Sequence, residues 1–467
     1  MNDKEFLGNQ PVGKLLFKLA VPSVVAQLIN MLYNIVDRIY IGHISGVGDM
    51  ALTGVGVCMP VIMVVSAFAA LVGSGGAPRA SIFMGKKEDA RAETILGNCF
   101  TFQIIISAAL TAVMLIWNHD FLMAFGASQN TIGYAEDYMN IYAIGTIFVQ
   151  LTLGMNAFIT AQGFAKTGMY SVIIGAVFNI ILDPIFIFTF NMGVRGAALA
   201  TVISQAVSCA WVLSFLFGKK TLLKLRCTNM RLQASVIFPC LALGLAVFVM
   251  QSSESVISVC FNTSLLKYGG DMAVGAMTIL TSVMQFAMLP LQGLGQGAQP
   301  IISYNYGARN KDRVKEAFWL LFKASMVYAT ALWLCVMLFP QVFAAMFTPN
   351  TALLAFTKKA LRIYMACMLL FGIQVSCQMT FTSIGYARES IIVAVMRKFV
   401  LLLPLIFLMP NIFPADKTMA VYAAEPIADF LAVSFTAVLF SIQFRKALKQ
   451  LEKPENEAGE TIKPNKS

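Results

Sequence analysis

The stretch MAVGAMTILTSVMQFAMLPLQGLGQGAQPIISYNYGA, residues 272–308, contains no Asp, Glu, Lys or Arg. About 20 apolar residues are enough for a helix to cross the roughly 30 Å hydrocarbon core of a bilayer, and this stretch is longer. Backbone groups in lipid must find hydrogen-bond partners within their own segment, so a continuous helix is the expected structure. The stretch therefore predicts a transmembrane helix.

The rest of the chain repeats this pattern. Further runs without charge cover 50–78, 94–118, 138–165, 196–218, 324–357 and 363–387. Hydrophobic residues make up 58% of the 467 and charged residues 12%, about half the usual share, which excludes an ordinary cytosolic enzyme. We expect an all-α polytopic membrane protein whose twelve spans cover 15–42, 51–78, 94–118, 133–162, 168–189, 196–217, 233–262, 272–298, 315–340, 352–383, 390–411 and 419–444.

The basic residues predict the orientation in the membrane. With both termini in the cytoplasm, 27 of the 34 Lys and Arg fall on the cytoplasmic side of the twelve spans. This bias is the one that cytoplasmic loops carry. The net charge of +11 is thus explained by topology, and no nucleic-acid partner is expected. The nine cysteines include no C-x-x-C pair, so we expect neither zinc nor another cofactor.

The sequence matches itself at an offset of 222 residues. Asp49-Met50-Ala51 recurs as Asp271-Met272-Ala273, and a run of glycines, Pro78 and Ser81 recurs around Pro300 and Ser303. A duplicated unit with an even number of spans gives two halves of the same orientation, an arrangement found in transporters that alternate access between two sides. The expected parts are a six-helix lobe at 1–217, a cytoplasmic linker at 218–231, a second six-helix lobe at 232–446 and a disordered tail at 447–467.

An acid lies in the middle of the fifth expected span. Asp183 follows Asn179 by one turn and precedes Pro184, which should bend the helix beside the acid. A carboxylate inside the membrane is costly and marks a functional site by default. Carboxylate, amide and freed carbonyl oxygens could hold a proton or a small hard cation such as Na⁺.

A polar stripe runs along the first span and ends in a second acid. Ser23, Gln27, Asn30, Asn34 and Asp37 are spaced by three or four residues, so they share one helix face. We expect this face to line a polar cavity in the first half, with Asp37 and Asp183 as the ion-coupling pair.

The second half lacks both acids at the 222-residue offset, where Val259 and Leu405 stand instead. Its own acids, Glu254, Glu425 and Asp429, form a possible second titratable site, with Arg397 and Lys398 as candidate partners. Glutamines and methionines predict an adaptable substrate-cavity wall in this half. These residues are Met284, Gln285, Met288, Gln292, Gln374 and Gln378.

These motifs together resemble the multidrug and toxic compound extrusion (MATE) transporters, in their MepA-like bacterial branch. The matching pieces run from the first span to the last: LYNIVDRIYIG (32–42), GSGGAPRASIFMGKK (73–87), NIILDPIFIF (179–188), GAALATVISQ (196–205), GLGQGAQPIISYNYGAR (293–309) and AEPIAD (424–429).

The resemblance implies a two-lobe exporter of amphipathic, mostly cationic drugs, driven by H⁺ or Na⁺. It also implies a multi-pass monomer in the bacterial plasma membrane. Carried over by motif, Asp37, Asn179, Asp183 and Thr201 form the coupling site, with Asn156 as a weaker match.

Two alternatives remain beside this interpretation. A lipid or polysaccharide-precursor flippase of the same superfamily is the nearest one, although it would be expected to place more basic residues in the central cavity. An intramembrane aspartyl protease would use the G-x-G-D pattern at 46–49, but these residues fall in an expected external loop. No enzyme activity is expected.

Overall fold

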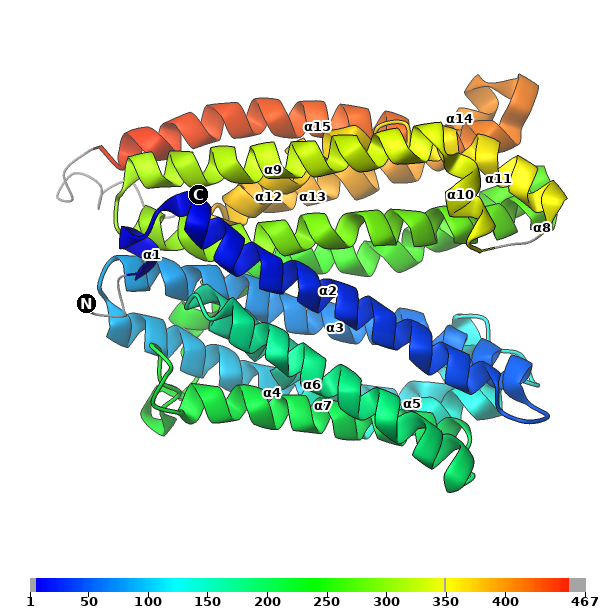
Figure 1. Cartoon of the computed structure of the whole chain (residues 1–467), viewed down its shortest axis with the longest axis horizontal. Coiled ribbons are helices and arrows are strands. Elements are labelled where there is room, and N and C mark those ends of the chain that lie inside the picture. Colours follow the sequence, from blue (N-terminus) through cyan, green and yellow to red (C-terminus); the bar gives the residue numbers. More distant parts are fainter. Residues whose placement is uncertain (1–5, 348–349, 453–467) are drawn as a thin grey trace. The chain divides into compact units, whose positions relative to one another are not determined.

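The computed structural model describes residues 6–347 and 350–452. These residues form helices joined by short loops and contain no strand (Figure 1). The first half contains α1 (Phe6–Asn9), α2 (Val12–Gly42), α3 (Gly48–Gly85), α4 (Asp89–Ala124), α5 (Ile132–Ala161), α6 (Ala165–Pro184), η2 (Ile185–Thr189) and α7 (Val194–Phe217). After η3 (Cys227–Asn229) come α8 (Ala234–Gly307), α9 (Lys311–Leu338), α10 (Pro340–Ala345), α11 (Thr351–Tyr364), η4 (Met368–Leu370), α12 (Phe371–Ser383), α13 (Ala387–Val395), η5 (Met396–Leu402), α14 (Leu403–Ile412), η6 (Pro414–Asp416) and α15 (Lys417–Gln450).

The described residues hold ten helices long and apolar enough to span a membrane, or eleven when one bent pair is counted as a span. The expected number was twelve, and α8 accounts for the difference. At 1.5 Å per residue its 74 residues would reach about 110 Å, far beyond one bilayer crossing. The chain breaks inside α8 at Gly270, where φ is 63° and ψ is −162°. The expected spans 233–262 and 272–298 are therefore both present and join at this glycine.

Three expected spans are broken rather than continuous. The tenth, 352–383, consists of α11 and Met368–Ser383, which meet at a bend of 42°. The fifth ends its α-helix at Pro184 and continues as the π-helical turn η2. The eleventh has the π-helical segment η5 before Pro404. Proline lacks an N–H and crowds the preceding turn, so the bend predicted beside Asp183 appears as a change of helix type.

The described chain packs into two compact units. Among the described residues, unit 1 takes 6–17, 81–88, 260–347 and 350–452, and unit 2 takes Lys18–Ala80 and Asp89–Val259. These units follow packing rather than sequence halves, because α2, α3 and α8 each contribute to both. The expected lobe boundaries stay a prediction. Part of the expected tail is helical, since α15 runs to Gln450, and the tail from 453 onward lies outside the described residues.

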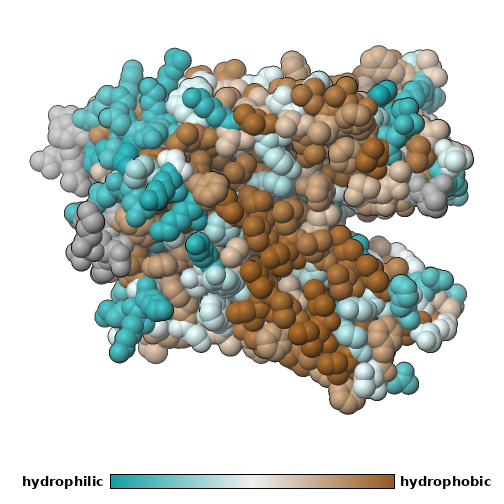
Figure 2. All heavy atoms as spheres, in the orientation of Figure 1, coloured by the Kyte–Doolittle hydropathy of each residue, from teal (hydrophilic) through white to brown (hydrophobic). Residues whose placement is uncertain are grey.

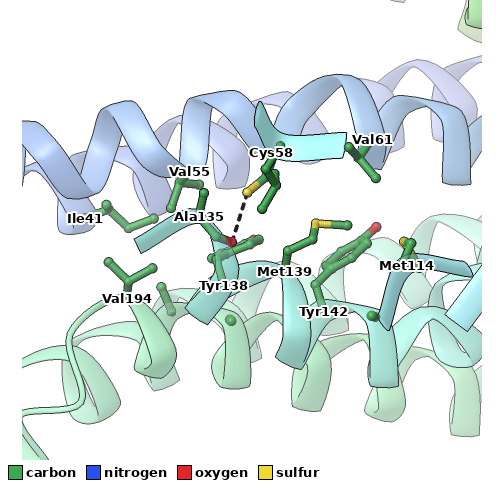
Figure 3. Close-up of a cluster of buried hydrophobic side chains, with 14 of the residues drawn as sticks. Ile41, Val55, Cys58, Val61, Met114, Ala135, Tyr138, Met139, Tyr142 and Val194 are labelled. Atoms are coloured by element: carbon green, nitrogen blue, oxygen red, sulfur yellow. Dashed lines mark hydrogen bonds between the residues drawn. The ribbon is translucent and has the colours of Figure 1, made fainter. Parts of the chain in front are cut away.

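The core of unit 2 lies among α2, α3, α4, α5 and α7. Tyr138, Met139 and Tyr142 of α5 pack beside Cys58 of α3, whose thiol donates to the Ala135 carbonyl at 3.5 Å (Figure 3). The two tyrosine rings stack with centroids 6.3 Å apart. This cluster fixes the face of α5 that adjoins the polar end of α2.

The linker is fastened to unit 2. The side-chain oxygen of Gln162 accepts hydrogen bonds from the Thr221 hydroxyl and from the backbone N–H groups of Leu222 and Leu223, at 2.8–2.9 Å. Asn98 accepts from the Gln233 N–H at 2.6 Å. Hydrogen bonds therefore hold the linker against unit 2.

The internal duplication is visible as a contact inside unit 1. A Cβ atom on Gly85 would lie 2.0 Å from the Tyr304 carbonyl oxygen, and one on Gly307 would lie 1.9 Å from the Ile82 carbonyl oxygen. Both glycines and both carbonyl-bearing residues are related by the same 222-residue offset. The ends of α3 and α8 thus cross at a repeat-related point that only glycine permits.

Surface polarity follows the helix direction within each unit. Figure 2 shows brown, hydrophobic side chains over the middle of the helices and teal, hydrophilic ones toward their ends. Exposed apolar residues include Ile144, Phe238, Val327 and Val438, all on long helices. Such a belt is expected of a protein whose surface meets lipid.

Candidate ion-coupling site

Two acids meet inside unit 2. Asp37 on α2 is 6% exposed and Asp183 on α6 is fully buried, and their carboxyl groups interact directly. Arg38, the neighbour of Asp37, is exposed, and its positive charge acts on the Asp37 carboxyl. The structure therefore brings together the two acids that the sequence placed on separate spans.

Asn179 connects the acid pair to α7. Its side-chain N–H group donates to an oxygen of Asp183 at 3.3 Å and to the Thr201 hydroxyl at 3.4 Å. The first contact lies within α6, where residues four apart share a face. The second crosses to α7. Asn179, Asp183 and Thr201 thus form one continuous polar group on two packed helices.

Several acceptor oxygens at this site receive no hydrogen bond from the described residues. They are Oδ1 of Asp37, Oδ2 of Asp183, Oδ1 of Asn179 and Oε1 of Gln205. Buried polar atoms are rarely left without a partner, and each such atom calls for an explanation. A set made only of acceptors is completed by protons or by a cation that prefers oxygen ligands.

Tyrosines complete the surroundings and were not anticipated from the sequence. The Tyr138 side chain interacts with Thr201, and that of Tyr33 interacts with Asn34 and Gln205. Tyr33 lies three residues after Asn30 and four before Asp37 on the polar stripe, so helical spacing could have identified it. Tyr138 could not be found this way, because only packing brings α5 to the site.

The other predicted site residues of unit 2 differ in how far they are buried. The Asn156 side chain donates to the Gly168 carbonyl at 3.3 Å, at the start of α6, and no described contact joins it to the acids. Asn34 donates to the Asn30 carbonyl at 2.6 Å on its own helix. Gln27 is half-buried and Asn30 is exposed. The stripe on α2 thus passes from an open middle to a buried acid.

The predicted cavity residues of unit 1 divide into two sets. On α8, Gln285 and Gln292 are exposed, and Met284 and Met288 are half-buried. On α12, Gln378 donates to the Ser390 hydroxyl at 3.1 Å, and neither amide atom of Gln374 has a partner among the described residues. The α8 set is accessible and the α12 set is internal.

The predicted acids of the second half belong to different units. Glu254 is exposed on the part of α8 that belongs to unit 2. Glu425 and Asp429 are buried on α15 in unit 1, where both contact Arg397. Glu425 and Asp429 thus form a buried acid pair within unit 1, and the second titratable site stays a prediction.

Comparisons with known proteins agree with this architecture. The chain is 23% identical over 436 residues to the multidrug export protein MepA of Staphylococcus haemolyticus, covering 93% of this chain and 95% of that protein. MepA of Staphylococcus aureus strain N315 is also 23% identical, over 415 residues.

Solved structures show the same fold. A MATE crystal structure in a bent conformation gives a TM-score of 0.90 at 22% identity, over 97% of this chain and all of that one. A MOP superfamily transporter from Pyrococcus furiosus, described as having a binding pocket of reversed polarity, gives 0.88 at 22% identity over 97% of this chain and 99% of that one. The MatE family model matches twice, at residues 22–185 and 246–408, one match in each sequence half. The chain therefore belongs to the MatE family of membrane transporters.

Proposed function

We propose that this chain exports amphipathic, mostly cationic drugs and toxic compounds, in exchange for H⁺ or Na⁺, by alternating access. One observation carries the proposal: Asp37 and Asp183 are buried together, and Arg38, the base whose charge acts on Asp37, is itself exposed. Two close carboxyl groups inside a membrane are stable when a proton or cation neutralises them. The relatives named as multidrug export proteins support the choice of cargo.

The acids act as a shared acceptor for ion and cargo. Facing outward, the deprotonated pair takes up a proton or Na⁺, with Asn179 and Thr201 holding the carboxylate geometry. Neutralisation removes the need for water around Asp37, so the polar face of α2 repacks and the cargo leaves. Facing inward, the ion departs and a cationic compound is attracted to the carboxylates and to the glutamine–methionine residues of the second half.

The membrane potential supplies a sufficient driving force. Moving one charge across 100 mV provides about 2.3 kcal/mol. At about 1.4 kcal/mol per tenfold change, this sustains a gradient of roughly 50-fold for one ion per transported molecule. We place the protein in the bacterial plasma membrane as a monomer, with both termini in the cytoplasm.

The flippase alternative calls for basic residues that meet lipid phosphates. The buried bases of unit 1 are Arg397 and Lys398, and Arg397 is already paired with two acids. The pair at Asp37 and Asp183 presents negative charge. This polarity favours a cationic cargo over an anionic lipid headgroup.

Dye efflux in everted membrane vesicles tests the proposal. A ΔpH and a Na⁺ gradient are imposed separately, and accumulation of a fluorescent cationic dye is followed. The Asp183→Asn variant should lose ion-driven transport, because an amide can neither bind a proton nor neutralise Na⁺. The matched control is Asp137→Asn, the same change at a half-exposed acid of the same unit, and it should transport normally. Full ion-driven transport by Asp183→Asn would disprove the coupling role.

A further inference from the structure

Unit 1 contains a buried cation of its own beside two buried acids. The Arg397 Nε atom lies 2.8 Å from a carboxylate oxygen of Asp429, and its Nη2 atom lies 3.7 Å from one of Glu425. All three residues are at least 94% buried. The guanidinium also stacks over the Phe371 ring, 4.9 Å from its centroid. Arg397 is thus held by two charges and an aromatic face.

Other titratable residues adjoin this cluster. Lys398 follows Arg397 on η5 and is 3% exposed. Cys367, before η4, interacts electrostatically with Asp429. Arg397 itself belongs to the π-helical segment η5, and π-helical turns occur often at functional sites. The cluster therefore joins η5, α15 and the Phe371 end of α12.

The acids of unit 2 have a different origin in the chain, because Asp37 lies on the first expected span and Asp183 on the fifth, whereas Glu425 and Asp429 both lie on the twelfth. Asn179 and Asp183 lie on the fifth expected span and Thr201 on the sixth. Arg397 lies on the eleventh expected span, and Glu425 and Asp429 lie on the twelfth. In unit 2 the buried acceptors lack a partner, and in unit 1 a guanidinium reaches both acids. Unit 1 therefore holds a covalently attached cation beside its buried acids, whereas buried acceptor oxygens of unit 2 are open to a dissolved one.

We propose that Arg397 is a built-in counter-ion that prevents Glu425 and Asp429 from taking up a coupling ion, so that each chain has one ion-coupling site instead of two. A guanidinium stays charged at any physiological pH and cannot leave, so the acids it neutralises do not exchange ions. Removing the guanidinium should convert this cluster into a second site for Na⁺ or a proton. The inference goes beyond the proposed function, which it uses only in taking Asp183 as the ion acceptor of unit 2.

Ion-dependent thermal stability of the purified full-length protein tests this inference without transport. Tm is measured in detergent against NaCl, with choline chloride keeping ionic strength constant, and then against pH. The key variant carries Arg397→Gln together with Asp183→Asn, so that the unit 2 site is silent. We expect a saturable rise in Tm with Na⁺ or with falling pH in this double variant, and none in Asp183→Asn alone.

Three controls separate charge from packing. Arg397→Lys keeps the positive charge and should show no new ion response. Arg195→Gln breaks an exposed Arg–Asp contact of the same 2.8 Å length, with Asp137, and should also show none, because water replaces the lost partner. Adding Glu425→Gln and Asp429→Asn to the key variant should abolish its new response.

Each outcome decides the question. A folded double variant whose Tm ignores both Na⁺ and pH overturns the inference. If the double variant folds only in high Na⁺ or at low pH, the inference is supported, because dissolved cations then replace the guanidinium. If it folds under no condition, Arg397 acts through packing and the inference fails. If the wild type binds no ion at Asp37 and Asp183, the proposed function is wrong. The Tm response of the Arg397 variants would still test the inference about Arg397.

Discussion

Asn179 is the residue on which the geometry of the coupling site depends. It is 1% exposed and donates to Asp183 and Thr201 from one side-chain nitrogen, while its oxygen accepts nothing from the described residues. Loss of a donor to a buried charged group costs about 1–3 kcal/mol. The amide therefore contributes through its contact with the carboxylate, and its oxygen is available to an incoming ion.

We predict that Asn179→Ala weakens the apparent affinity for the coupling ion by roughly 5- to 100-fold. The substitution removes both the donor that holds Asp183 and an acceptor for the ion. The measurement is initial dye-efflux rate against Na⁺ concentration or pH. Ser204→Ala is the control, because that hydroxyl donates to the Thr201 carbonyl of its own helix and does not contact the acids among the described residues. Equal ion dependence in the two variants would contradict the prediction.

At the scale of elements, close helix crossings decide where glycine is required. A Cβ on Gly75 of α3 would lie 1.9 Å from the Cys240 carbonyl oxygen of α8, whereas one on Gly56 of the same helix meets nothing within 4 Å. The two glycines thus have opposite packing environments on one helix. Backbone approach rather than conformational freedom explains the glycine at 75.

We predict that Gly75→Ala lowers stability by about 1–3 kcal/mol through overpacking. Gly56→Ala should be neutral or stabilising by about 0.5–1 kcal/mol, because alanine is the better helix former. The measurement is Tm of the two purified variants in the same detergent. Equal Tm shifts of the same sign would show that the crossing can move apart without cost.

The attachment of the linker to unit 2 depends on one glutamine, Gln162. Because Gln162 accepts three hydrogen bonds from residues 221–223, its replacement should release the basic linker. We predict that Gln162→Ala raises the rate of tryptic cleavage between Lys219 and Arg231 several-fold. The exposed Gln251→Ala is the control and should be cleaved as the wild type is. Unchanged cleavage in Gln162→Ala would show that other contacts, such as that of Asn98, hold the linker alone.

At the scale of the whole molecule, topology rests on the distribution of 34 basic residues. The basic segments gather at one end within each unit. In unit 1, Arg309 donates to the Gln450 carbonyl at 2.8 Å, and Lys311 contacts Glu452. In unit 2, Glu93 accepts from the Lys224 N–H at 3.1 Å. These contacts join the basic starts and ends of helices that the positive-inside rule assigns to the cytoplasm.

Cys227 allows the orientation to be tested without adding a reporter, because it is exposed in the linker. We predict that a membrane-impermeant maleimide labels Cys227 in everted vesicles and not in intact cells. The Cys227→Ser variant should not be labelled. Loss of labelling in this variant would show that Cys227, and no other cysteine, reacts with the maleimide. Labelling of Cys227 in intact cells would reverse the proposed orientation.

The sequence by itself determined the membrane class, the apolar spans, the duplication and the acids at 37 and 183. It did so because hydropathy and residue spacing are local properties that add up along one helix. It did not reveal the π-helical segment η5 or the bend between α11 and Met368–Ser383, since these depend on how helices pack. Only the tertiary structure decided that Tyr138 adjoins the coupling site, that Asn179 bridges Asp183 and Thr201, and that Arg397 reaches both Glu425 and Asp429. Contacts between distant helices depend on crossing angles and helix rotation, which no local pattern in the chain encodes.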